Sequence, residues 1–163
     1  MASLENIVSY FINHHPDKQT LSADKLKLLV YLADWKSALE YGRQLTNIVW
    51  EIKDGRLFVP RPSYEKLNLP KTRFSYIRYL LKSWLSVREK QSKLRNKETF
   101  ILDFVVKSTA GKNWEDLLQL IYSTYPTIGE QQVDELNLES MASNYKSRVR
   151  PLFSGSYKKS FGS

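Results

Sequence analysis

The stretch Leu21–Gly42, LSADKLKLLVYLADWKSALEYG, constrains the fold of this chain more than any other. Its apolar residues recur at the spacing of a helix face, and the four from Leu28 to Tyr31 are consecutive. Ser22 is suited to cap the start of the helix, and Gly42 stands where a left-handed cap is expected at its end. Because so wide an apolar arc needs cover on more than one side, we expect this helix to be buried at the centre of the fold.

The rest of the pattern predicts further helices and one small hairpin. Asp54 and Gly55 separate two β-prone runs, and this pair is typical of a tight turn, so we predict a hairpin over residues 48–59 that prolines then end. The expected fold class is mainly α, a compact helical domain around the central helix (residues 21–42) with the hairpin packed on it. The other helices are predicted over residues 3–13, 72–91, 99–109, 114–125 and 137–147, with Pro126 stopping the fourth of them.

Length and composition predict one domain over residues 1–147. Residues 148–163 are rich in Ser, Gly and Lys and are expected to form a basic tail, disordered when free. The chain has no cysteine, which excludes disulfides and thiolate metal sites. No signal-peptide pattern and no long apolar run is present, so we expect a soluble cytoplasmic protein with no membrane partner.

Positive charge is concentrated in one part of the chain. The net charge is +8, and residues 56–100 alone hold 12 Lys and Arg against 3 Asp and Glu. Such a block is typical of a surface that meets an anionic partner, either nucleic acid or an acidic protein. The alternative is a solvated face that keeps the protein soluble.

The common catalytic constellations are absent from the sequence, which predicts that the protein is not an enzyme and needs no cofactor. The adjacent His14 and His15 are expected to be surface residues at a helix end, because no third ligand accompanies them for a metal. Asp34 is the carboxylate expected to be partly buried, with a structural hydrogen-bonding role. Three further acidic residues are expected to lie in the first turns of helices, where capping and solvation explain them without catalysis: Asp103, Glu115 and Asp116.

Two motifs resemble one known family. KLKLLVYLADW (Lys25–Trp35) is followed by ALEYGRQLT (Ala38–Thr46) and Trp50, and a second run, ILDFVV, comes before Trp114 and LIYSTYP. In order and spacing these motifs are similar to the Panacea domain, the SocA-like antitoxin family. The residues that carry the resemblance, and that we interpret as structural, are Lys25, Leu28, Tyr31, Asp34, Trp35, Gly42, Trp50, Trp114 and Pro126.

The resemblance implies a non-enzymatic protein of bacteria or phages that binds and neutralises a co-encoded toxin by direct contact. It also allows a role as an adaptor that delivers the toxin to a protease. Two alternatives stay open: a nucleic-acid-binding autoregulator that uses residues 56–97, and a phage or mobile-element inhibitor of a host defence protein. From charge and expected exposure, the candidate partner contacts are Arg56, Phe58, Arg61, Arg73, Arg78 and Lys82.

Overall fold

The computed structural model describes residues 3–53, 56–58, 94–128 and 135–149. Over these residues the protein is mainly helical with a small two-stranded antiparallel sheet, which confirms the predicted fold class. None of the described helices is both long enough and apolar enough to cross a membrane. The elements, in chain order, are α1 (Leu4–His14), the 3₁₀ turn η1 (Lys18–Thr20), α2 (Ala23–Tyr41), β1 (Glu51–Lys53), β2 (Arg56–Phe58), α5 (Asn96–Thr109), α6 (Trp114–Tyr122), α7 (Leu138–Asn144) and the π-turn η3 (Tyr145–Val149).

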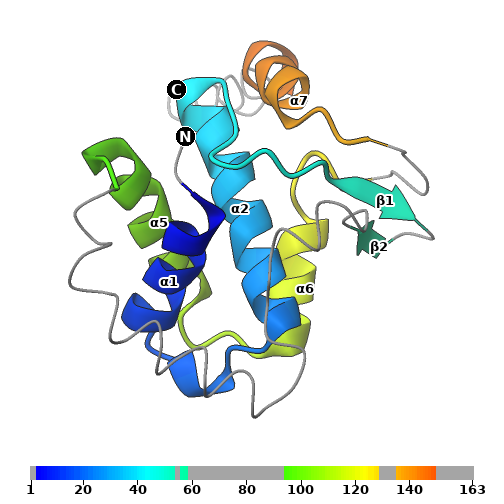
Figure 1. Ribbon diagram of the computed structural model, residues 1–163. Helices are drawn as coiled ribbons and strands as arrows, with labels where there is room; N and C mark the ends of the chain where they lie inside the picture. The colour runs from blue at the N-terminus through cyan, green and yellow to red at the C-terminus, as the bar shows by residue number, and fades with distance from the viewer. Residues whose placement is uncertain (1–2, 54–55, 59–93, 129–134, 150–163) are drawn as a thin grey trace, which may run out of the picture.

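Helix α2 is the centre of the fold, as its sequence predicts. Figure 1 shows α1 and α5 on one side of it and α6 on the other, with α7 near its C-terminal end, and all four helices contact it. Its residues from Leu28 to Trp35 are all buried, so the helix has no polar face in its middle. Both predicted caps are present. The Ser22 hydroxyl accepts a hydrogen bond from the Lys25 N–H at 3.1 Å, and Gly42 has a φ of 72°.

Helix α5 begins at Asn96, three residues earlier than predicted. The Glu98 carboxylate explains the difference, because it accepts a hydrogen bond from the Arg95 N–H at 2.9 Å and so satisfies a donor at the helix start. The expectation that Asp103 lies in a first turn is therefore wrong. Asp103 lies in the middle of α5, where its carboxylate accepts a hydrogen bond from the Tyr10 hydroxyl and fixes α1 to α5.

Helix α6 begins where predicted, with Asn113 as its N-cap, but it ends at Tyr122, before the expected stop at Pro126. The hydroxyls of Ser123 and Thr124 donate to carbonyl oxygens three residues back, at 2.8 and 2.7 Å. These side chains satisfy the last carbonyls of the helix and favour a turn over another helical turn. The last predicted helix is present as α7, which continues into η3.

The predicted hairpin is present, with strands shorter than residues 48–59. Strands β1 and β2 are antiparallel, and Ile52 is paired with Leu57; both side chains are buried. The Leu57 N–H donates to the Tyr122 hydroxyl at 3.3 Å, which fixes the hairpin to α6. The predicted Asp-Gly turn, the predicted helix over residues 72–91 and residues 150–163 of the predicted tail lie outside the described residues.

Candidate interaction surface

Most of the partner contacts predicted from charge lie outside the described part of the chain. Of the six, Arg56 lies on β2 and is exposed. Phe58 lies on the same strand, and its side chain is outside the described residues, as are the other four, Arg61, Arg73, Arg78 and Lys82. Of the six predicted contacts, Arg56 is therefore the one whose side chain the structure describes.

One residue of the resemblance, Asp34, is a buried carboxylate that binds the chain following α2. Its Oδ1 accepts hydrogen bonds from the backbone N–H groups of Leu45 and Thr46, at 2.9 and 2.8 Å. Its Oδ2 accepts from the Thr46 hydroxyl at 2.5 Å and from the Trp50 indole N–H at 2.9 Å. Burial raises the pKa of the Asp34 carboxyl, and the four donated hydrogen bonds oppose that rise. All four donor groups belong to the chain that follows α2, so Asp34 has the structural hydrogen-bonding role expected of it.

Two aromatic residues of the resemblance extend this structural cluster. The Tyr31 ring packs edge-on against Trp50, with centroids 5.3 Å apart, and its hydroxyl hydrogen-bonds to Thr124 at 2.9 Å. Trp35 packs in the same way against Tyr145, at 6.3 Å. Leu28 and Pro126 are buried, Lys25 is half-buried and Trp114 is exposed. The motif residues that are buried therefore hold helices together and present no shared surface to a partner.

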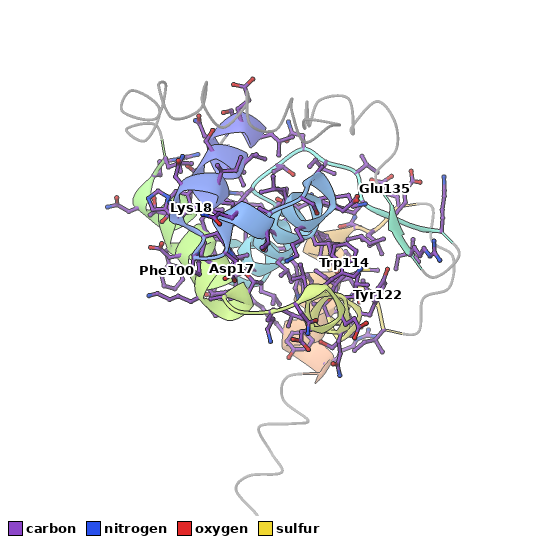
Figure 2. The ribbon with its side chains drawn as sticks, turned by 90° about the horizontal axis from the view of Figure 1, so that it is seen from below. Asp17, Lys18, Phe100, Trp114, Tyr122 and Glu135 are labelled. Carbon is purple, nitrogen blue, oxygen red and sulfur yellow. The ribbon has the colours of Figure 1, made fainter. Side chains whose placement is uncertain are left out.

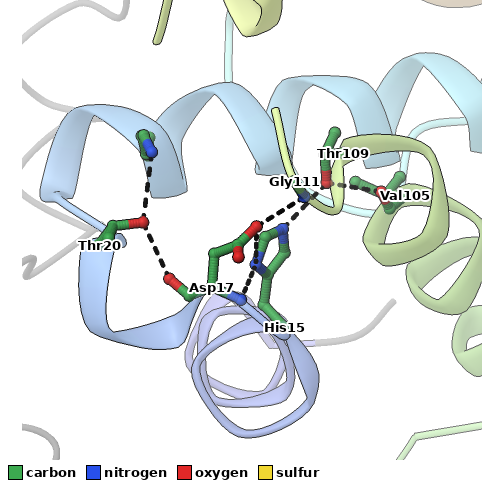
Figure 3. Close-up of polar contacts among 7 residues, drawn as sticks. His15, Asp17, Thr20, Val105, Thr109 and Gly111 are labelled. Atoms are coloured by element: carbon green, nitrogen blue, oxygen red, sulfur yellow. Dashed lines mark hydrogen bonds and ion pairs between the residues drawn. The ribbon is translucent and has the colours of Figure 1, made fainter. Parts of the chain in front are cut away.

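The expectation of two surface histidines is half wrong, because His15 is buried. Its Nδ1 accepts a hydrogen bond from the Asp17 N–H at 3.1 Å, which leaves Nε2 to donate to the Thr109 hydroxyl at 3.2 Å (Figure 3). Asp17 in turn accepts from the Gly111 N–H at 2.7 Å. The network ties the α1–α2 connection to the end of α5, and burial lowers the pKa of His15.

His14, by contrast, is exposed as predicted and stacks on the Tyr10 ring at 4.0 Å. Within the described ranges, no group of three or more His, Asp or Glu side chains is placed to hold a metal ion. The histidines are thus explained by packing and hydrogen bonding.

A different surface is exposed where α2 and α5 pack together. Three aromatic side chains are only partly covered there: Tyr41 is 38% exposed, Phe100 54% and Phe104 45%. Phe100 and Phe104 are one turn apart on α5, and Figure 2 shows Phe100 at the outer edge of the molecule, away from Trp114 on α6. Large aromatic side chains grouped on one exposed face are typical of a protein–protein contact.

Two lysines connect these rings across the helix pair. The Lys36 Nζ lies 4.2 Å from the centroid of the Phe104 ring, and the Lys97 Nζ lies 5.3 Å from that of Tyr41. Because residue 36 of α2 meets residue 104 of α5 and residue 41 meets residue 97, the two helices run antiparallel here. These residues form a group that we call the α2–α5 surface: Lys36, Tyr41, Lys97, Phe100 and Phe104.

A cavity of about 540 Å³ adjoins this surface at the start of α5. Tyr41 and Lys97 belong to both the cavity and the surface, so the two are continuous. Among the described residues that line it, the one carboxylate is Glu98, which is buried and ion-paired with Arg95 at 3.1 Å. The cavity is lined by Ser37, Tyr41, Arg43, Gln44, Leu45, Arg95, Asn96, Lys97 and Glu98.

The charge pattern directed the predicted contacts to residues 56–97, which stop short of Phe100 and Phe104, and so did not indicate this surface. A signal was present in the sequence, because Ile101, Leu102 and Val105 have the spacing of one apolar helix face, and all three are buried. On a helix with that inner face, Phe100 and Phe104 point outward.

Comparison of the chain with family models, curated proteins and solved structures finds no significant match.

Proposed function

We propose that this protein is a non-enzymatic, antitoxin-type binding protein of the bacterial or phage cytoplasm, which neutralises a co-encoded toxin by direct protein–protein contact through the α2–α5 surface. The observation that carries the proposal is the group of exposed aromatic side chains, Tyr41, Phe100 and Phe104, on two packed helices. Aromatic side chains at the centre of an interface supply much of its binding energy. Rigid helices hold these rings in place before a partner arrives, which lowers the entropy lost on binding.

The resemblance to the Panacea domain supports the same function from independent residues. Its motif residues on α2 and in the following loop form the structural cluster around Asp34 and do not coincide with the exposed rings. A scaffold held by one set of residues and a binding face formed by another is consistent with family members that share a fold and bind diverse toxins. Delivery of the bound toxin to a protease stays part of the proposal as a further step.

The experiment is co-expression of the protein with the product of the adjacent open reading frame. We expect the neighbour alone to arrest growth, this protein to restore it, and the two to co-elute from a sizing column. A double variant, Phe100→Ala with Phe104→Ala, is expected to lose both rescue and co-elution while Trp114→Ala, an exposed aromatic on α6, keeps both. Absence of rescue and of a complex with the unaltered protein would overturn the proposal.

A further inference from the structure

We infer that the α2–α5 surface takes an acidic, amphipathic segment of the partner protein. In this arrangement apolar side chains of the segment pack on Phe100 and Phe104, and one carboxylate enters the adjoining cavity between Arg43 and Lys97. The inference rests on the proposed function and adds the chemistry of the partner to it.

The apolar half of the inference comes from the geometry of α5. Phe100 and Phe104 are four residues apart and about half exposed, so they form a strip one helical turn long. Lys36 covers part of one ring with its charged end, and that end is already ion-paired with Glu40 at 2.5 Å. The strip therefore has an apolar centre with a charge-neutral pair at its edge, which suits apolar side chains of a partner.

The acidic half comes from a count of paired and unpaired charges around the cavity. Arg95 is neutralised by Glu98, whose carboxylate is buried. Arg43 and Lys97 line the same cavity, and within the described residues neither has a carboxylate partner. An entering carboxylate would gain charge-assisted hydrogen bonds from both, and the planar guanidinium of Arg43 allows two parallel bonds.

The same charges argue against nucleic acid as the occupant. A phosphate backbone needs a row of cations, because each phosphate carries a charge. Here the cations alternate with the carboxylates of Glu40 and Glu98, and two of the four cations are already ion-paired with them. One cavity beside an apolar strip matches a single carboxylate with apolar neighbours better than it matches a chain of phosphates.

The test uses the full-length protein and overlapping 15-residue peptides that cover the product of the adjacent open reading frame. Binding is measured by fluorescence anisotropy. We expect one region to bind, with an Asp or Glu flanked by apolar residues. Arg43→Glu and Lys97→Glu should each weaken its binding by at least about tenfold, and so should the double phenylalanine variant. Lys112→Glu between α5 and α6 and Trp114→Ala on α6 are the matched controls, expected to leave binding unchanged.

A charge swap gives the positive arm of the test. Replacing the critical acid of the peptide with Lys should abolish binding to the unaltered protein and restore binding to Lys97→Glu. If the whole neighbour binds and is neutralised, but none of the surface variants changes its affinity, the inference is wrong and the proposed function stands. If there is no complex and no rescue, the proposed function fails first.

Two further outcomes would overturn the inference. The first is binding of a 20-nucleotide RNA or single-stranded DNA that depends on Lys97 and competes with the neighbour, which would make the surface a nucleic-acid site. The second is a melting temperature lowered by several degrees in the free Phe100→Ala, Phe104→Ala variant. That result would mean that the protein's own residues cover the rings.

Discussion

The indole N–H of Trp50 donates a 2.9 Å hydrogen bond to Oδ2 of Asp34, and both residues are fully buried. Sixteen residues separate them, so this bond closes the chain that leaves α2 back onto the helix. With the donors from Leu45 and Thr46, it satisfies a carboxylate that would otherwise be isolated in an apolar core. The stability of the fold should depend on this one side chain.

We therefore predict that Asp34→Asn lowers the free energy of unfolding by about 2 to 4 kcal/mol. The amide replaces one acceptor oxygen with an NH₂ group, which would face N–H donors that cannot turn away. Urea unfolding followed by tryptophan fluorescence measures the change. Asp24→Asn is the control on the same helix, because its carboxylate is exposed and only 3.7 Å from Lys27; it should cost less than about 1 kcal/mol. Equal effects of the two substitutions would contradict the role assigned to Asp34.

The end of α2 gives a second prediction, which depends on backbone conformation alone. Gly42 has a φ of 72°, and a Cβ built there would meet no atom within 4 Å. Gly42→Ala should thus cost about 1 kcal/mol, from the left-handed conformation and not from a clash. Gly42→Asn should cost less, because Asn tolerates this conformation better. A larger loss for Asn than for Ala in the same unfolding experiment would show that contacts, and not φ, decide the cost.

The His15 network gives a prediction about pH. Burial lowers the pKa of His15 below its ordinary value of 6.5, while Asp17 opposes the shift and Lys25 adds to it. The unfolded chain then binds the proton at a higher pH than the folded protein does, so stability is fully present above about pH 6.5 and falls as the pH drops below it. Unfolding measured between pH 7.5 and 5 should show this decline. His15→Gln should remove it, and a decline that persists unchanged in that variant would assign the effect to other groups.

The same network shows where sequence reasoning stops. The helix over residues 21–42 could be predicted almost to the residue, because Ser22 and Gly42 act through hydrogen bonds and dihedral angles of the local chain. The burial of Asp34 could also be predicted from its apolar neighbours. The burial of His15 could not, because its partner Thr109 is 94 residues away and no local pattern records that approach.

The α2–α5 surface lies between these cases. Its residues are visible in the sequence, but their exposure depends on which face of α5 packs against α2. The pattern predicts the start of that helix at Thr99, and Lys97 lies in the residues that the structure adds before it. The cap formed by Glu98 extends the helix and brings Lys97 next to Tyr41, which the charge pattern alone did not indicate.

The last prediction separates the two kinds of residue on that surface by the kinetics of the proposed complex. Lys97→Met removes an exposed charge, so it should lower the association rate and reduce the dependence of that rate on salt. Phe104→Ala removes apolar contact and should mainly raise the dissociation rate. Surface plasmon resonance with the neighbouring gene product at two salt concentrations measures both rates, with Trp114→Ala as the control expected to change neither. A dissociation rate that is unchanged in Phe104→Ala would mean that the ring is outside the interface, because contact area lost at the centre of a complex shortens its lifetime.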